Sequence, residues 1–365
     1  MKKVLTIVLA LAMVFAFAAC TQNPTTEPST ETSAPAEVSS AAPETSEAAP
    51  ADFDPSQYSV AICMPVYNHP VHRIVQLGFL KAAQELGYTN AKVIGTEGGD
   101  NAEVWAAAEA FAAEGGDAIL LWAGDSSAYE TIASLGSQGV LVGIPHFNHK
   151  QADGSYPEGL SFNMACDPVL YGKQVAELMA DKLSGKTGSV ALTQNTMNIT
   201  ENAANESFRS TWESLKSTKQ LDGITLLDTE LEGGVVDEAT AINLSIIQAH
   251  SDIIGAFGTT GNSPITWADA ATKAGKADGE LVIVGMDATE GNLDYLDAGK
   301  VTALVAQPLY QEAYKTMEYF DKMFRGEEVP MWTDLTAPIV TKDGEGENGM
   351  EYHRGIAAEV ATFFQ

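Results

Sequence analysis

The chain has few cysteines, few basic residues and no long hydrophobic run beyond its first twenty residues. Three cysteines in 365 residues do not imply a disulfide framework, so Cys63 and Cys166 are expected to be buried as small hydrophobic residues. The 49 acidic residues outnumber the 20 Lys and Arg residues, and the formal charge of −29 repels nucleic acid and anionic lipid. No later segment approaches the roughly 20 apolar residues that a transmembrane helix needs.

Motifs of catalysis are also missing. The chain contains no G-x-S-x-G elbow, no phosphate-binding G-x-x-x-x-G-K-[ST] loop and no H-E-x-x-H pair. Asp and His without a nucleophile at a strained turn are weak support for catalysis. We therefore predict a protein that is not an enzyme and that needs no cofactor.

The first twenty residues predict an exported lipoprotein. Lys2 and Lys3 precede an apolar run over residues 4–17 that is too short to span a membrane, as in a signal peptide. The segment Phe17-Ala18-Ala19-Cys20 resembles the lipobox of bacterial lipoproteins, and this resemblance implies lipidation of Cys20. An ordinary secretory signal is the alternative. The expected location is extracytoplasmic, at the outer face of the bacterial cell membrane or in the periplasm.

Residues 21–57 consist almost entirely of Thr, Ser, Pro, Glu, Ala and Gln. Such a composition cannot bury enough apolar surface to offset the entropy of ordering, so this segment is predicted to be a disordered acidic linker. The remaining chain is long enough for two domains of ordinary size.

From residue 58 onward, short β-rich runs alternate with amphipathic helical patterns. The first strand is predicted over residues 59–64 and the first helix over residues 71–86, with Gly87 at its end. Asp100 and Glu103 are expected to form a capping box at the start of the second helix. A second series begins near Leu160, with a helix capped by Asp167. Continuous apolar strands separated by helices favour parallel sheets that are covered on both faces. The predicted fold class is α/β, with two doubly wound parallel-sheet lobes.

In such sheets a ligand binds beyond the carboxyl ends of the strands. The loops expected there carry side chains that suit a small polar ligand, because amides and carboxylates bind hydroxyl groups and aromatic faces bind the C–H side of a sugar ring. We expect Asp125 and Thr289 to cap helices instead. The candidate ligand-binding residues are Asn68, His69, His72, Trp122, His146, Phe147, Asn205, Thr260, Asp287 and Gln307.

Four of the six histidines, His69, His72, His146 and His149, lie in two loops that are expected to meet at this crevice. Neutral imidazoles bind zinc or copper, so a metal site is an alternative. No Cys or paired carboxylate accompanies them, and we predict ligand hydrogen bonding or exposure rather than a metal site.

Four motifs carry a family resemblance: Tyr67-Asn68-His69-Pro70, Ala274-Gly275-Lys276, Gly285-Met286-Asp287 and Val305-Ala306-Gln307. In order and spacing they resemble the type I periplasmic binding proteins of the ribose and galactose group, the substrate-binding components of ABC importers. The resemblance covers about residues 58–326. It implies that Asp287 and Gln307 bind sugar hydroxyls, and that His69 and His72 supply contacts from the first lobe.

The sequence departs from this family at other positions. His146-Phe147 stands where ribose-type members place an Asp-Arg pair, Asn205 is the nearest counterpart of a second-lobe Arg, and Thr260 replaces a common Asn. Imidazole, amide and aromatic groups thus replace bidentate guanidinium forks. An amino, deoxy or polyol derivative, or a nucleoside, fits these exchanges as well as a free pentose does.

The resemblance also implies the domain boundaries. Lobe 1 is expected over residues 58–161 and about 308–332, and lobe 2 over residues 162–307 and about 333–345. Residues 346–365 form a C-terminal extension without a predicted role. The chain is expected to cross a hinge several times, and the lobes to close around the ligand.

These inferences predict an extracytoplasmic solute-binding lipoprotein of an ABC importer that binds a monosaccharide or sugar derivative. Its expected partners are the small-molecule ligand, a permease with its ATPase, and the membrane through the lipid on Cys20 only, without nucleic acid. A monomer is expected. The alternatives are a sensing module for a chemoreceptor or kinase, and a nucleoside- or metal-binding protein of the same fold.

Overall fold

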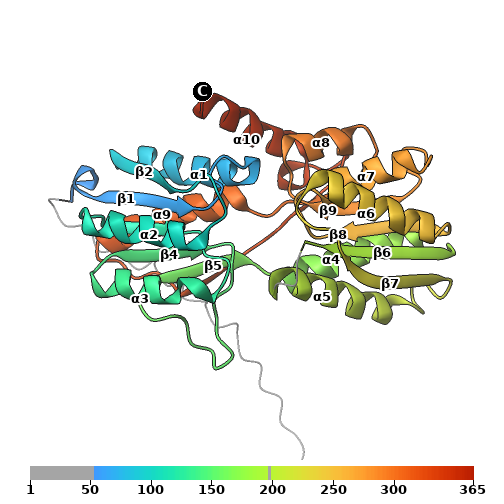
Figure 1. The fold of residues 1–365 in the computed structure, drawn as a ribbon, viewed down its shortest axis with the longest axis horizontal. Coiled ribbons are helices and arrows are strands. Elements are labelled where there is room, and N and C mark those ends of the chain that lie inside the picture. The colour runs from blue at the N-terminus through green and yellow to red at the C-terminus, as the bar shows by residue number, and fades with distance from the viewer. Residues whose placement is uncertain (1–52, 196–198) are drawn as a thin grey trace, which may run out of the picture. The chain divides into compact units, whose positions relative to one another are not determined.

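The computed structural model describes residues 53–195 and 199–365. The predicted signal peptide, Cys20 and residues 21–52 of the predicted linker lie outside the described residues. The predicted end of the linker at residue 57 is wrong, because Pro55–Gln57 form a 3₁₀ turn and Phe53 stacks on Tyr58. Within the described ranges, no helix is both long and apolar enough to cross a membrane. The chain forms two six-stranded sheets with helices packed on them, as Figure 1 shows, and this confirms the predicted fold class.

Lobe 1 is the first sheet with its helices. Its elements are β1 (Ser59–Met64), α1 (Pro70–Leu86), β2 (Asn90–Gly95), α2 (Asn101–Ala113), β3 (Ala118–Leu121), α3 (Tyr129–Ser137), β4 (Leu141–Pro145), β5 (Phe162–Cys166), α9 (Leu309–Phe324) and β11 (Trp332–Leu335), with short 3₁₀ turns at Pro55–Gln57 and Ser126–Ala128. The strand order is β11-β5-β4-β3-β1-β2, and every pairing is parallel.

Lobe 2 is the second sheet with its helices. Its elements are α4 (Pro168–Leu183), β6 (Gly188–Gln194), α5 (Ile199–Leu215), β7 (Ile224–Leu231), α6 (Val236–Ala249), β8 (Ile253–Gly258), α7 (Ser263–Lys273), β9 (Val282–Met286), α8 (Glu290–Asp297), β10 (Ala303–Val305) and β12 (Ile339–Val340). The strand order is β12-β10-β9-β8-β6-β7, and only β12 pairs antiparallel, with β10.

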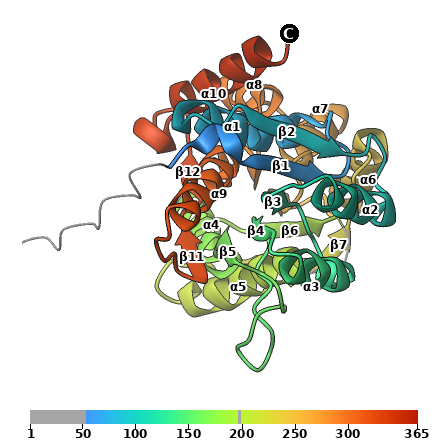
Figure 2. The same ribbon diagram turned by 90° about the vertical axis from the view of Figure 1, so that its left-hand side faces the viewer.

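The four inner strands of lobe 1, β1, β3, β4 and β5, bury both of their faces, whereas the edge strands β2 and β11 keep exposed residues. Val60, Ile62 and Met64 of β1 belong to a core shared with α1 and α9, while Ala61 and Cys63 belong to a core shared with α2 and α3. Because successive strand residues point to opposite faces, the two cores lie on opposite sides of the sheet. Figure 2 shows the helices of lobe 1 on both sides of this sheet. This arrangement explains why the strands are continuously apolar rather than alternating.

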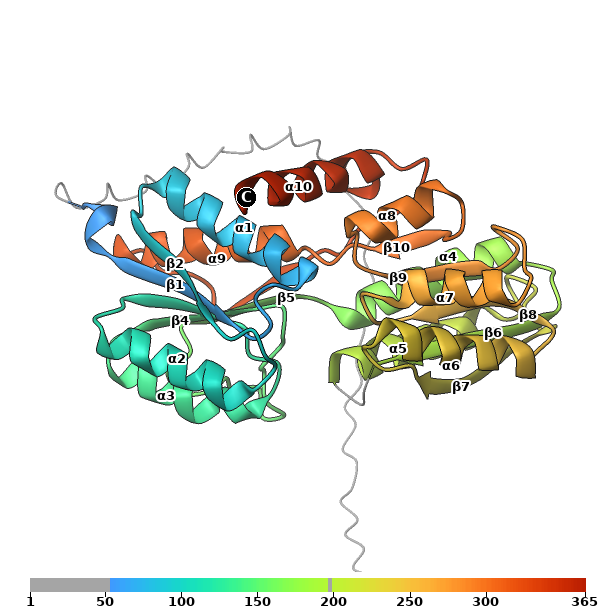
Figure 3. The ribbon, with the colours of Figure 1, turned by 45° about the horizontal axis from the view of Figure 1, so that its top comes forward.

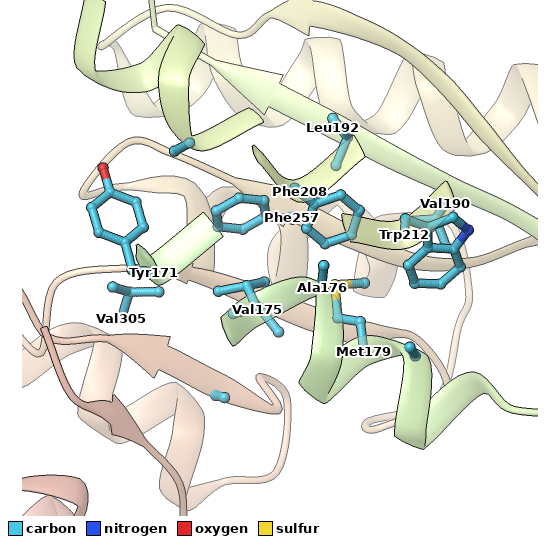
Figure 4. Packing of buried hydrophobic residues seen from close by; sticks show 14 of the residues in the cluster. Tyr171, Val175, Ala176, Met179, Val190, Leu192, Phe208, Trp212, Phe257 and Val305 are labelled. Atoms are coloured by element: carbon cyan, nitrogen blue, oxygen red, sulfur yellow. The ribbon is translucent and has the colours of Figure 1, made fainter. Parts of the chain in front are cut away.

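The core of lobe 2 contains a stack of large aromatic side chains. Phe208 of α5 lies between Trp212 and Phe257 of β8, with ring centroids 5.6 Å and 5.5 Å apart (Figure 4). Tyr171 and Val175 of α4 belong to the same core. Rings of this size bury a large apolar area, so they fix how α4 and α5 pack on the sheet.

Local capping confirms several sequence predictions. The side chains of Asp100 and Asp167 each accept a hydrogen bond of 2.8 Å from a backbone N–H in the first turn of α2 and α4. Gly87 ends α1 with φ +89°, a left-handed conformation that glycine adopts without strain. Cys63 and Cys166 are both buried free thiols, as expected.

The predicted lobe boundaries are wrong by one strand. Residue 162 was expected to begin lobe 2, but β5 starts there and pairs with β4 and β11 in the first sheet. Likewise, β11 extends to Leu335, beyond the predicted end of lobe 1 near residue 332. An apolar strand pattern does not say which sheet the strand joins. The chain therefore crosses between the sheets at residues 167, 306–308 and 336–338.

The C-terminal extension is a helix that contacts both lobes. Helix α10 (Met350–Phe363) follows a 3₁₀ turn at Gly346–Asn348 and packs on α1 and α8, as Figure 3 shows. Glu359 forms an ion pair with Lys81 of α1, and Arg354 lies 2.9 Å from Asp294 of α8. The predicted extension thus joins elements of lobe 1 and lobe 2.

Two glycines let helices approach closely in the two lobes. A Cβ atom on Gly78 of α1 would lie 2.2 Å from the carbonyl oxygen of Tyr310 in α9. A Cβ atom on Gly172 of α4 would lie 2.3 Å from the carbonyl oxygen of Ala204 in α5. The backbone of a neighbouring helix cannot move aside as a flexible side chain can. The close packing of α1 on α9, and of α4 on α5, therefore requires glycine at these positions.

We predict that Gly78→Ala and Gly172→Ala each lower the free energy of unfolding by about 1–3 kcal/mol, because the added methyl group forces the helices apart. Gly355→Ala in α10 is the matched control, since nothing lies within 4 Å of its Cβ position. That control is expected to be neutral or to stabilise by up to about 1 kcal/mol. Urea unfolding measures all three variants, and equal effects at Gly78 and Gly355 would contradict the close packing.

Candidate functional site

Most of the predicted ligand-binding residues follow the carboxyl ends of strands. In lobe 1 they come after β1, β3 and β4, and in lobe 2 after β8, β9 and β10, with Asn205 on α5. The carboxyl ends of parallel strands share one edge of each sheet, where a doubly wound fold binds its ligand. Two side chains that we expected to be caps do cap: Asp125 accepts from Ser127 N at 2.8 Å, and Thr289 accepts from Asn292 N at 3.4 Å.

Two loops of lobe 1 and the first turn of α1 contribute rings to one cluster. Trp122 is 7% exposed, and it stacks on the His146 ring with centroids 4.6 Å apart. Phe147 and His72 meet Trp122 edge-on, at 5.3 Å and 5.5 Å. We call His72, Trp122, His146 and Phe147 the lobe 1 aromatic cluster. Such a cluster suits the apolar face of a sugar ring or a flat base.

His146 is held by a buried carboxylate. Its Nδ1 atom lies 3.0 Å from Oε1 of Glu312 on α9, a side chain that is fully buried. Burial lowers the pKa of His146, but the charge and hydrogen bond of Glu312, together with the charge of Asp287, raise it above its ordinary value. The second oxygen of Glu312, Oε2, is buried and has no hydrogen-bond partner among the described residues.

Asp287 is the buried acid of lobe 2. The residue is 5% exposed, and burial raises the pKa of its carboxyl to about 6, although the charge of His146 opposes this and those of Glu312 and Glu201 add to it. Its Oδ1 atom is buried without a hydrogen-bond partner in the described part of the chain. Natural proteins leave few buried polar atoms unpaired, so this oxygen is a candidate ligand acceptor.

A side-chain amide holds the Asp287 loop in a strained conformation. Asp287 has φ +65°, which is unfavourable for a residue with a Cβ atom. Nδ2 of Asn292, fully buried in α8, lies 2.8 Å from the carbonyl oxygens of Asp287 and Gly261 and 3.1 Å from that of Met286. The backbone N–H of Asp287 donates to Val305 O at 2.8 Å. These contacts fix where the carboxylate points.

Two other predicted residues of lobe 2, Asn205 and Thr260, differ in whether they keep a side-chain atom free to hydrogen-bond to a ligand. Asn205 donates through Nδ2 to Gln194 Oε1 at 2.9 Å, and its buried Oδ1 has no partner among the described residues. The hydroxyl of Thr260 lies 3.1 Å from Glu232 Oε1 and 2.9 Å from Ser263 Oγ. Thr260 is therefore engaged within lobe 2, whereas Asn205 keeps a free acceptor.

The loop after β1 makes local contacts. Asn68 accepts a hydrogen bond from Arg73, and His69 caps α1 by accepting from Val71 N at 3.3 Å. Nδ1 of His72 lies 3.0 Å from Val66 O, and burial lowers the pKa of His72 to about 4. His72 is therefore neutral near pH 7.

The four clustered histidines of the sequence do not all meet. The rings of His69 and His72 are 5.4 Å apart, and the charge of His146 acts on His72. His149 instead is 5% exposed, with Nε2 2.7 Å from Ala123 O. Across residues 53–195 and 199–365, no group of three His, Cys, Asp or Glu side chains is placed to hold a metal ion.

Gln307 lies in residues 306–308, where the chain crosses from the second sheet to the first. The partly buried Gln307 side chain acts on the thiol of Cys166, whose pKa is raised chiefly by burial. Gln307 also lines a cavity of about 160 Å³ between the hinge and α10, together with residues such as Ala306, Leu335 and His353.

The sequence-based prediction missed Glu312. It considered only loops after strands, and Glu312 lies in the first turns of a helix. The available signal was a charged residue on the apolar face of α9, between Leu309, Ala313 and Thr316, which are all buried. A charge at such a position needs a partner, and here the partner is His146.

We predict that Asp287→Asn makes the ligand-free protein more stable above pH 6. A carboxyl whose pKa is raised on folding contributes most to stability below its unfolded pKa of about 3.8, and that contribution is lost as the pH rises to about 6. The variant should therefore gain on the order of 2 kcal/mol near pH 7.5, and the gain should vanish near pH 4. Urea unfolding between pH 4 and pH 8 tests this. Asp278→Asn, at an exposed site, is the control, and a gain independent of pH would contradict the buried charge.

Comparison with solved structures finds proteins that share this fold. A sugar-binding protein of a sugar ABC transporter from Bacillus halodurans is similar with a TM-score of 0.71 and 20% identity, covering 81% of this chain and 99% of that chain. An ABC transporter solute-binding protein from Burkholderia graminis C4D1M, in complex with D-arabinose, has a TM-score of 0.69 and 18% identity, covering 80% and 97%. The glucose-galactose binding protein GanP of Geobacillus stearothermophilus has a TM-score of 0.67 and 19% identity, covering 78% and 97%.

Identities this low show a shared fold. No curated protein matches the chain. A family model described as a periplasmic binding protein domain does match, over residues 60–328, which include both sheets apart from β11 and β12. With two parallel-sheet lobes, a chain that crosses between them three times and a match over most of its length, the chain belongs to the periplasmic binding protein domain family.

Proposed function

We propose that this protein is the extracytoplasmic solute-binding component of an ABC importer, and that its ligand is a monosaccharide or a sugar derivative. The observation that supports this most directly is that one lobe carries an aromatic cluster and the other an unpartnered buried hydrogen-bond acceptor. Lobe 1 offers the aromatic cluster with Trp122 at its centre, and lobe 2 offers the unpartnered carboxylate oxygen of Asp287. An aromatic face with a buried acceptor is the combination that a sugar ring with hydroxyl groups requires.

The two lobes bind the ligand by closing around it. Asp287 and Asn205 keep unpartnered buried oxygens on lobe 2, and His146 stands on lobe 1 close enough for its charge to act on Asp287. A ligand that bridges these groups favours the closed state by its differential affinity for that state. Binding and release of the ligand require closing and opening of the lobes but no chemical step.

Delivery to the importer follows from the sequence outside the described residues. The lipid expected on Cys20 and the acidic linker before residue 53 keep a monomeric binding protein near the outer face of the membrane while leaving it free to turn. The membrane contact is through the lipid alone. The partners are the permease and its ATPase.

We expect a sugar-class ligand to stabilise the purified protein after bound solute has been removed by unfolding and refolding. At 100 times its dissociation constant such a ligand adds about 2.7 kcal/mol of stability. Thermal-shift screening covers pentoses, hexoses, polyols, amino sugars, nucleosides and Zn²⁺. Asp287→Ala and Trp122→Ala should each weaken the hit about tenfold or more. Asp278→Ala is the exposed control. A response to Zn²⁺ alone would overturn the sugar proposal.

A further inference from the structure

The charges at the junction of the two lobes do not balance. Asp287 is acted on by one base, His146, and by two further acids, Glu312 and Glu201. No lysine or arginine among the described residues shares in this interaction. Arg73, the arginine nearest along the chain to a candidate residue, donates to Asn68 and to Gln76. The junction therefore holds excess negative charge.

Two carboxylate oxygens of this junction are buried and unpartnered. Asp287 is 5% exposed and Glu312 is fully buried, yet Oδ1 of the first and Oε2 of the second have no hydrogen-bond partner among the described residues. The remaining oxygen of Glu312 is occupied by His146. A buried carboxylate oxygen without a donor is costly, because the charge has lost its water and gained no partner.

A neutral sugar compensates this cost only in part. Its hydroxyl groups can donate to the two oxygens, but they leave the excess negative charge in place. An ammonium group donates as well and also cancels one unit of charge, and such charge-assisted hydrogen bonds are roughly twice as strong as neutral ones. The aromatic cluster adds to this preference, because indole faces attract cations.

We propose that the ligand is a cationic sugar derivative, an amino sugar, whose ammonium group binds the carboxylate of Asp287 while its ring lies against Trp122. This inference rests on the proposed function and narrows its ligand class. Glu312 acts as a positioning residue: it holds His146 and contributes negative potential.

The test compares sugars that differ only in the amino group. The panel is glucosamine, galactosamine and mannosamine, each beside its neutral hydroxyl parent and its neutral N-acetyl derivative. Isothermal titration near pH 6.5 keeps the amines protonated. The expected result is that one amine binds the wild-type protein about tenfold more tightly than both of its neutral partners.

Two variants locate the effect. Asp287→Asn should bring the ratio of amine to neutral affinity close to one, and Glu312→Gln, on the other lobe, should lower the same ratio. Asp278→Asn should leave it unchanged. Because the ratio is measured within one variant, a general loss of stability cannot imitate the result, and circular dichroism confirms that each variant is folded.

Other outcomes separate this inference from the function on which it rests. If a neutral parent or N-acetyl sugar binds as tightly as its amine, or if Asp287→Asn keeps the preference for the amine, the cationic ligand is ruled out and sugar binding stands. If no pentose, hexose, polyol or amino sugar binds the wild-type protein, the proposed sugar-binding function itself fails.

Discussion

The buried group formed by Glu312, His146 and Asp287 is the constraint on which the site depends. Glu312 comes from a helix of lobe 1, His146 from the end of a lobe 1 strand, and Asp287 from the end of a lobe 2 strand. Their charges influence one another across the junction of the lobes. Ionised groups withdrawn from water in this way destabilise the protein unless each finds a partner. Both His146 and Asp287 have raised pKa values, so these two groups favour the folded state most at lower pH.

The side chains of Glu312, His146 and Asp287 are held in position by the residues packed around them. Trp122 stacks on His146, Asn292 fixes the carbonyl groups around Asp287, and α1 packs closely against α9 at Gly78. Both His146 and Asp287 have positive φ values, and non-glycine residues keep such conformations only where the surroundings enforce them. The strained backbone at the ends of β4 and β9 thus coincides with buried side-chain oxygens, of Asp287 and Glu312, that have no hydrogen-bond partner among the described residues.

Helix α10 adds a feature that lies beyond the family match, which ends at residue 328. Its ion pairs reach α1 through Lys81 and α8 through Asp294, so it touches elements of both lobes. Exposed ion pairs contribute little individually. The helix also borders the cavity that Gln307 lines.

The sequence by itself determined the α/β class, the two sheets, the caps at Asp100, Asp167 and Thr289, and the candidate loops after strands, because apolar periodicity and capping are local properties. Only the tertiary structure decided that β5 and β11 join the first sheet, that His149 is a core histidine while His146 is paired, and that Glu312 lies at the site. These facts depend on contacts between residues far apart in the chain. Glu312 and His146 are 166 positions apart, and no local pattern relates them.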